Sequence, residues 1–296
     1  MREHEVVAAD GAVLRAWRHG RDGHPVLGVA TIPELWPALL GPDTKLALHS
    51  WRPRGGLGCA GAGASTVENH VADAIAVLDA AGEQRCVVVG WSLEVSIAAA
   101  LALRHPDRVA GLLMIAGVPG ALTRLPEQIR CSLADTVTQV LRLAGPVLGA
   151  VLPRLPVTPA TMWPLRHSGL MRPAADPFDT ARLADRVLRE HWDWFIRLAL
   201  AVSTGPAQDL RGLRCPVTVL AGRHDMVTDV RRIAADLAGV AQTRLRILPT
   251  SHFIPLEAPE VVLDEVWALQ HRAAAVQVAV QAVNGDPLTN GLPPGT

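Results

Sequence analysis

The stretch RCVVVGWSLEVSIAAALALRHPDRVAGLLMI, residues 85–115, decides the fold of the chain. Arg85–Gly90 is a β-branched run of the kind that forms a strand buried on both faces of a sheet. The chain then turns sharply at Trp91-Ser92 into Leu93–Arg104, an Ala- and Leu-rich helix that ends before a proline. Val109–Ile115 is the next strand. This strand–helix–strand order predicts right-handed crossovers and a parallel sheet.

The same alternation continues on both sides of this unit. Upstream, we expect a hairpin of His4–Ala9 with Val13–Trp17, short strands at Pro25–Ala30 and Lys45–His49, and a helix over Ser65–Ala81. Downstream, the expected strands are Pro216–Ala221 and Arg244–Leu248, and the expected helices are Val227–Leu237 and Pro259–Val276. The fold class is therefore α/β, with a mostly parallel central sheet flanked by helices.

The strand signal disappears between these two halves, from Gly117 to about Pro206. That segment has the pattern of several helices punctuated by prolines, so we interpret it as a helical cap inserted into one α/β domain. The expected division is a core in two parts, 1–116 and 207–277, with the cap at 117–206. Residues 278–296 form a Pro- and Gly-rich tail that we expect to be disordered.

Composition limits the partners and the compartment. The 296 residues include 28 Lys and Arg and 28 Asp and Glu, so no basic excess is left for binding nucleic acid. No window of about 18 residues is free of charges and helix breakers, which argues against a transmembrane segment. The N-terminus lacks the apolar core of a secretory signal, and the four cysteines have no metal or redox spacing. We therefore expect a cytoplasmic protein with reduced thiols and with Cys86 packed in the core.

Ser92 occupies the position where the central strand meets its helix. A serine on such a turn is forced into a strained backbone conformation that exposes its hydroxyl above the carboxyl end of the sheet. The amide of Leu93, at the N-terminus of the helix, points into the same space and can stabilise an oxyanion. Serine alone is a weak nucleophile, so this interpretation requires a base and a group that orients the base.

Asp225 and His252 supply these two groups. Asp225 lies in the loop after the strand VTVLA, and His252 lies in the loop after the strand RLRIL. The carboxyl ends of parallel strands are where open α/β sheets bind ligands, so the three side chains are expected to meet there. His252 would take the Ser92 proton and return it to the leaving group, while Asp225 would orient the imidazole and stabilise its cation.

Each of these residues also has an ordinary structural interpretation. Ser92 could be a helix N-cap, Asp225 a turn residue, and His252 a loop histidine bonded to backbone. Their order along the chain, serine then acid then histidine, favours the catalytic interpretation. For Trp91 two interpretations stay open, because its ring could line an acyl pocket or simply cover the turn at Ser92.

Three segments together resemble the α/β-hydrolase family. The elbow, helix and next strand of that family resemble GWSLE and SIAAALALRHPDRVAGLLMI; its acid loop resembles LAGRHDMVT; and its histidine loop resembles SHFIPLEAPE. The resemblance covers about residues 4–275. It implies an esterase- or lipase-like serine hydrolase with a helical cap, and it makes Ser92, Asp225 and His252 the catalytic triad.

The chain departs from the family pattern at three places. Glu94 stands where the family has glycine or another small residue, and a carboxylate facing the site would oppose the charge of an oxyanion. Ala30-Thr31 replaces the usual His-Gly pair, which places the second oxyanion donor near Ile32. After the next strand, Ser50–Gly55 lacks the acidic residue and first glycine that relatives carry.

Two functions from different classes therefore remain. The first is a serine hydrolase that cleaves a carboxylic ester or related acyl bond through an acyl-enzyme, with water or another acceptor completing the reaction. The second is a binding or interaction protein that keeps the fold with its catalysis impaired, which the three departures motivate. Nothing in the sequence suggests a metal or organic cofactor. Apolar residues at helical spacing in 133–152 indicate either cap packing or a roof over an apolar acyl substrate, and the oligomeric state stays open.

Overall fold

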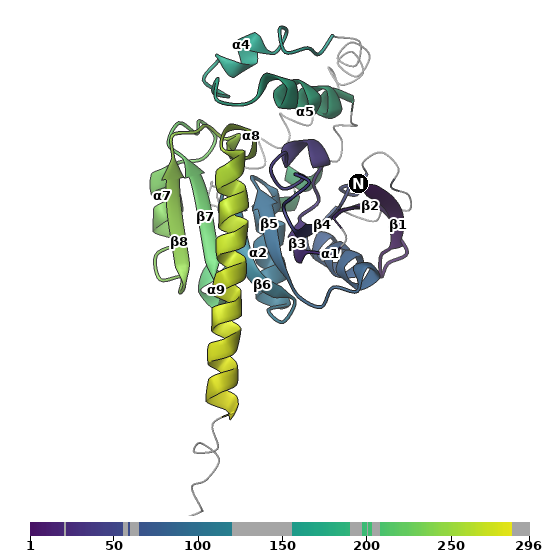
Figure 1. Cartoon of the computed structure of the whole chain (residues 1–296), viewed down its shortest axis with the longest axis vertical. Helices are drawn as coiled ribbons and strands as arrows, with labels where there is room; N and C mark the ends of the chain where they lie inside the picture. The colour runs from purple at the N-terminus through teal and green to yellow at the C-terminus, as the bar shows by residue number, and fades with distance from the viewer. Residues whose placement is uncertain are drawn as a thin grey trace, which may run out of the picture.

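The computed structural model of the chain describes residues 1–20, 22–55, 59, 65–119, 156–189, 197–199, 201–202 and 208–285. Within these ranges, eight strands form one sheet in the order β1-β2-β4-β3-β5-β6-β7-β8 (Figure 1). The strands are β1 (Arg2–Val7), β2 (Val13–His19), β3 (His24–Gly28), β4 (Leu46–Trp51), β5 (Cys86–Trp91), β6 (Val109–Ile115), β7 (Val217–Gly222) and β8 (Thr243–Leu248). β2 pairs antiparallel with β1 and with β4, and the other neighbours are parallel. The predicted hairpin and parallel sheet are confirmed.

The helices of the core cover both faces of this sheet. They are α1 (Val67–Ala81), α2 (Glu94–Arg104), α7 (Val230–Asp236), α8 (Ile254–Glu257) and α9 (Pro259–Gly285), with the 3-10 turns η1 (Pro33–Leu35) and η3 (Leu210–Gly212). One buried cluster joins the sheet to α1 and α2, and a second joins it to α9. On β5, Val88 belongs to the first cluster, whereas Val87 and Val89 belong to the second, because successive side chains of a strand point to opposite faces.

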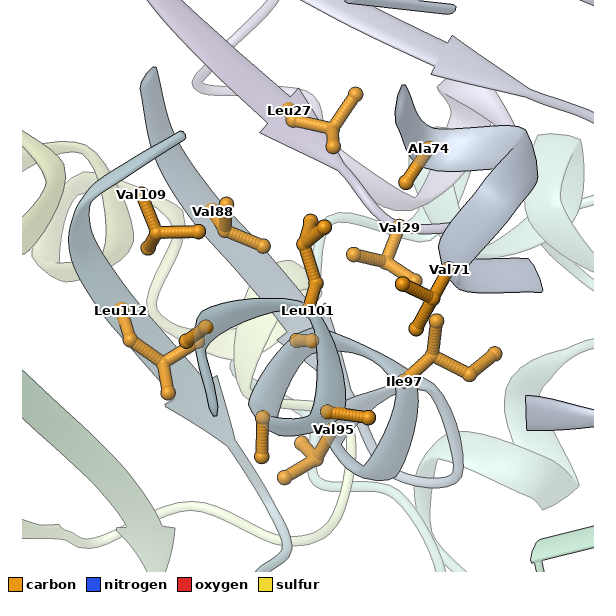
Figure 2. Packing of buried hydrophobic residues seen from close by; sticks show 14 of the residues in the cluster. Leu27, Val29, Val71, Ala74, Val88, Val95, Ile97, Leu101, Val109 and Leu112 are labelled. Carbon is orange, nitrogen blue, oxygen red and sulfur yellow. The ribbon is translucent and has the colours of Figure 1, made fainter. Parts of the chain in front are cut away.

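Figure 2 shows the layer between the sheet and the first pair of helices, in which Ile97 and Leu101 of α2 lie among side chains of β3, β5 and α1. Ile97, Leu101 and Val88 are fully buried. Burial of each such side chain is worth about 1.5–3 kcal/mol relative to exposure. This packing fixes α2 against β5 and therefore fixes the turn that joins them.

Between β6 and β7, the part of the chain that the structure describes includes the helices α4 (Trp163–Arg166) and α5 (Pro177–Arg189). Both lie beyond the end of the sheet at which α8 is found (Figure 1). Met171 and Ala175, in the connection between them, are buried in the same cluster as Ile254 of α8. The described part of 117–206 contains no strand, as expected for a helical insertion. The apolar run at 133–152 and the boundary at 206 lie outside the described residues.

The last helix is longer than the sequence analysis expected. We predicted that it would end near Val276, with a disordered tail from residue 278, but α9 continues to Gly285. The reason is the run of Ala, Val and Gln residues from 273 to 283, which contains no breaker before Asn284-Gly285. Residues 286–296 of the predicted tail lie outside the described residues. Among the helices that the structure describes, none is long and apolar enough to cross a membrane.

Candidate active site

The turn between β5 and α2 presents Ser92. The backbone of Ser92 has a φ of 55°, in the left-handed region that few residues other than glycine adopt. The turn is tight because Gly90 has no side chain: a Cβ at this position would lie 3.0 Å from the Ala98 Cβ and 3.0 Å from both Glu94 O and Val95 N. Backbone strain of this kind persists only where the surrounding structure fixes it, and it clusters at functional sites.

Three side chains from separate loops meet at this turn. Nε2 of His252 lies 2.8 Å from the Ser92 Oγ, and Nδ1 of His252 lies 2.8 Å from Oδ2 of Asp225. Asp225 follows β7 and His252 follows β8, so all three residues lie at the carboxyl ends of parallel strands. The side chain of His252 is 7% exposed and that of Asp225 is 0% exposed. The structure thus brings together the three residues that the sequence singled out.

Asp225 is held by hydrogen bonds to both of its carboxylate oxygens. The hydroxyl of Thr228 donates to Oδ2 at 2.5 Å, and the amides of Val227 and Thr228 donate to Oδ1 at 2.7 and 2.9 Å. Burial raises the pKa of Asp225, but the hydrogen bonds from His252 and Thr228 outweigh burial and hold that pKa below its ordinary value. An ionised Asp225 accepts the Nδ1–H of His252, which leaves the Nε2 lone pair facing the Ser92 hydroxyl.

The loops that carry Asp225 and His252 touch at Gly222. A Cβ on Gly222 would lie 2.2 Å from the carbonyl oxygen of Ser251 and 2.7 Å from that of Thr250, so only glycine allows this approach. The amide of His224 also donates to the Thr250 carbonyl at 2.9 Å. The distance between Asp225 and His252 is therefore set largely by the backbone.

Trp91 links the turn to the histidine loop from the other side. Its Nε1 donates to the His252 carbonyl at 2.9 Å, and its ring centroid lies 5.3 Å from that of His252 and 5.6 Å from that of Phe253. The sequence left Trp91 between covering the turn and lining a pocket. The described contacts give it a definite place against the histidine loop, and its role in a substrate pocket stays a prediction.

The two amides predicted as oxyanion donors lie in neighbouring segments. β3 pairs in parallel with β5, and Val29 just beyond β3 still donates its amide to the Val89 carbonyl at 2.9 Å. The chain therefore leaves β3 next to the turn at Ser92. Neither Leu93 nor Ile32 donates its amide to any acceptor among the described residues, so both N–H groups are available for another partner.

Thr31, just before Ile32, is fixed by four hydrogen bonds. The hydroxyl of Ser50 accepts from the Thr31 amide at 3.3 Å and donates to the Thr31 carbonyl at 3.4 Å. Nε1 of Trp17 donates to the same carbonyl at 3.2 Å, and Nε1 of Trp36 donates to the Thr31 hydroxyl at 3.2 Å. Two of the sequence departures, at Thr31 and at Ser50, thus contact one another, and together they hold the segment that carries Ile32.

Glu94 lies at the start of α2 and is buried, with 8% of the residue exposed. Burial raises the pKa of Glu94 to about 8, and its own amide is the sole group that opposes this rise. The side chain is therefore mostly a neutral carboxylic acid at pH 7. A neutral group does not repel an oxyanion as a carboxylate would, which removes the electrostatic objection raised by the sequence.

Several residues of the site carried no sequence signal of their own. Thr228 and Ser50 are ordinary loop and strand residues until their partners are known, and nothing in the sequence around Glu257 indicates its partners. Across the residues that the structure describes, no three His, Cys, Asp or Glu side chains lie together in a way that could hold a metal ion. Cys86 is fully buried in the core, as predicted.

A family model described as "alpha/beta hydrolase fold" matches residues 49–259. The chain belongs to the α/β-hydrolase fold family. This match confirms the resemblance that the elbow, acid-loop and histidine-loop segments indicated. No curated protein matches the chain in a sequence search.

Solved structures similar to the chain include three that illustrate the family. A thermophilic esterase from Thermogutta terrifontis with malate bound has 20% sequence identity over 92% of this chain and 99% of that chain, with a TM-score of 0.67. The enol-lactonase from Burkholderia xenovorans has 17% identity over 90% and 100% (TM-score 0.66), and an esterase from Exiguobacterium antarcticum has 16% identity over 90% and 98% (TM-score 0.69). At these identities the similarity establishes the fold and not the substrate.

Replacing Glu94 with glutamine should remove a pH-dependent loss of stability. The folded state holds the Glu94 proton up to a pH of about 8, whereas the unfolded state releases it near 4.5. Between these values each rise in pH favours unfolding of the wild type, and Glu94→Gln has no proton to lose. We therefore compare the free energies of unfolding of Glu94→Gln and wild type, measured with urea at pH 5 and at pH 8.5. The difference in favour of Glu94→Gln should grow by on the order of 3 kcal/mol from pH 5 to pH 8.5.

Glu68→Gln is the matched control. Glu68 is paired with Arg104, which lowers its pKa, so its carboxylate is ionised across this pH range. The stability of Glu68→Gln relative to wild type should not change between the two pH values. If the free energies of unfolding of Glu94→Gln and wild type differ by the same amount at pH 5 and at pH 8.5, the assignment of a neutral Glu94 is contradicted.

Removing the Ser50 hydroxyl should destabilise the segment before Ile32. Ser50→Ala leaves the buried amide of Thr31 without an acceptor, so we expect a loss of about 1–3 kcal/mol in the free energy of unfolding. Ser96→Ala is the control, because Ser96 is a buried residue of α2 whose hydroxyl makes no hydrogen bond to a described residue. A Ser50→Ala protein as stable as Ser96→Ala would show that the Thr31 contacts contribute nothing.

Proposed function

We propose that the protein is a serine hydrolase that cleaves a carboxylic ester or a related acyl bond through an acyl-enzyme on Ser92. The observation that carries the proposal is the unbroken chain of contacts from Ser92 Oγ to His252 and on to Asp225, with both distances at 2.8 Å. The strained backbone of Ser92 and the free amides of Leu93 and Ile32 support it. The esterases and the lactonase among the similar structures agree with acyl chemistry.

The first half of the reaction forms the acyl-enzyme. Ser92 Oγ attacks the carbonyl carbon while its proton passes to Nε2 of His252, and Asp225 stabilises the imidazolium that results. The amides of Leu93 and Ile32 donate to the oxyanion of the tetrahedral intermediate, and such donors are worth roughly 3–4 kcal/mol each in comparable sites. Collapse of the intermediate breaks the bond to the alcohol oxygen, which leaves with the proton from His252.

The second half releases the acid. A water molecule gives its proton to His252 as it attacks the acyl carbon. When the second tetrahedral intermediate collapses, the bond between the acyl carbon and Ser92 Oγ breaks and His252 returns the proton to Ser92 Oγ. Another acceptor in place of water would make the same site an acyltransferase. The substrate proposed is a small molecule with an apolar acyl part, for which the exposed side of the Trp91 ring would be one wall of the pocket.

A series of p-nitrophenyl esters from acetate to octanoate tests the proposal. We expect wild type to release p-nitrophenol and Ser92→Ala to lose roughly 10⁴-fold or more in kcat/KM, because the nucleophile is gone. Asp225→Asn should lose about 10⁴-fold, since it forces the wrong tautomer on His252. His224→Ala is the control: His224 is exposed beside Asp225, and its variant should stay within about twofold of wild type.

The competing binding-protein hypothesis gives a different pattern. It expects no ester turnover by a correctly folded wild type, together with a rise in melting temperature when an apolar carboxylic acid or ester is added. If wild type and Ser92→Ala hydrolyse the p-nitrophenyl esters at the same slow rate, Ser92 is not the nucleophile.

A further inference from the structure

Glu257 is a buried acid that the proposed mechanism does not use. It ends α8, five residues after His252, and is 8% exposed. Its Oε1 accepts from the Ser251 hydroxyl at 2.5 Å, and its Oε2 accepts from the Ser251 amide at 2.8 Å. Both bonds hold the residue that directly precedes His252 in the chain.

The same carboxylate also binds the cap. Oε1 of Glu257 accepts from the backbone amide of Arg172 at 2.8 Å, across 85 residues of sequence. Arg172 lies between α4 and α5 beside Met171, which is 2% exposed. On its other side this cap connection is tied to α4, because Arg166 Nη2 donates to the carbonyls of Pro173 and Ala175, each at 2.6 Å.

The contacts of Glu257 are unusual for a buried acid. Among the residues that the structure describes, no Lys, Arg or His side chain forms an ion pair with it. Its donors are instead two backbone amides and one hydroxyl. Hydrogen bonds to a carboxylate are stronger than bonds between neutral groups. A buried carboxylate that loses a donor is left without a substitute for water, which costs free energy. We therefore expect the contacts of Glu257 with Ser251 and with Arg172 to be made or broken together.

We propose that Glu257 is a positioning residue that aligns His252 through Ser251 and fastens the cap connection through Arg172. The inference rests on the proposed function of His252 as the base. Ser251 cannot shift without disturbing the approach to Gly222, and His252 itself is tied at its carbonyl by Trp91. A movement of the cap at Arg172 therefore removes a donor from the Glu257 carboxylate, which holds the histidine loop through Ser251.

The test compares Glu257→Gln and Ser251→Ala with wild type. Glu257→Gln places an amide N–H group against backbone donors and disturbs both links, whereas Ser251→Ala removes the hydroxyl link and leaves the Arg172 contact in place. For Glu257→Gln we expect kcat on a p-nitrophenyl ester to fall roughly 10- to 100-fold with little change in KM, because small displacements of a catalytic group have effects of this size. Glu260→Gln, an exposed acid in the next helix, is the control and should match wild type.

Hydrogen exchange followed by mass spectrometry separates the two links. In Glu257→Gln the amides of Arg172 and Ser251 should exchange roughly 10- to 100-fold faster, as expected when a bond to a charged acceptor is lost. In Ser251→Ala, kcat should fall while the Arg172 amide stays as protected as in wild type. Wild-type kcat in both variants, or unchanged protection of Arg172 in Glu257→Gln, would overturn the proposal.

These outcomes are distinct from failure of the proposed function. If wild type hydrolyses no ester, the role of His252 as the base fails, but the exchange rates of Arg172 and Ser251 still measure whether Glu257 holds both segments. If Glu257→Gln does not fold, Ser251→Ala decides the matter: an unchanged kcat in that variant would contradict alignment of His252 through Ser251.

Discussion

The backbone of Ser92 keeps its left-handed conformation because β5 and α2 are packed almost in contact beneath it. Gly90 makes that contact possible, since any side chain there would meet Ala98 and the first turn of α2. Fully buried aliphatic side chains between β5 and α2, such as Val88, Ile97 and Leu101, then keep the helix against the strand. The turn places the Ser92 hydroxyl beside His252 and leaves the Leu93 amide without an acceptor among the described residues, so the position of Ser92 follows in large part from core packing.

Asp225 and His252 reach this turn because three strands are parallel and end at the same edge of the sheet. Backbone contacts between the loops then hold the two side chains together. Gly222 lets the acid loop lie on the histidine loop, while Trp91 and Glu257 hold the histidine loop from two further sides. The α4–α5 connection enters this arrangement through Arg172, whose amide donates to the Glu257 carboxylate that also holds the loop of His252.

Much of this arrangement could be predicted from the sequence, because it depends on local patterns. The β-branched runs, the turn at Ser92 and the loops after two later strands identified the sheet, its direction and the three residues that meet. The state of Glu94 could not be predicted, since its raised pKa results from burial, which a position in the first turn of a helix does not reveal. The pairing of Ser50 with Thr31 and of Glu257 with Arg172 was equally hidden, because each joins segments that only the fold brings together. The end of α9 was misjudged because polar and Gly-rich residues begin only at Asn284.

Covalent trapping of Ser92 tests the central claim most directly. Wild type would be treated with a small fluorophosphonate, its intact mass measured, and the modified peptide sequenced by mass spectrometry. We expect one adduct per chain, located on Ser92, absent from Ser92→Ala and formed far more slowly in His252→Ala. A correctly folded wild type that forms no adduct, one that is modified at another residue, or a His252→Ala variant labelled as fast as wild type would contradict this expectation.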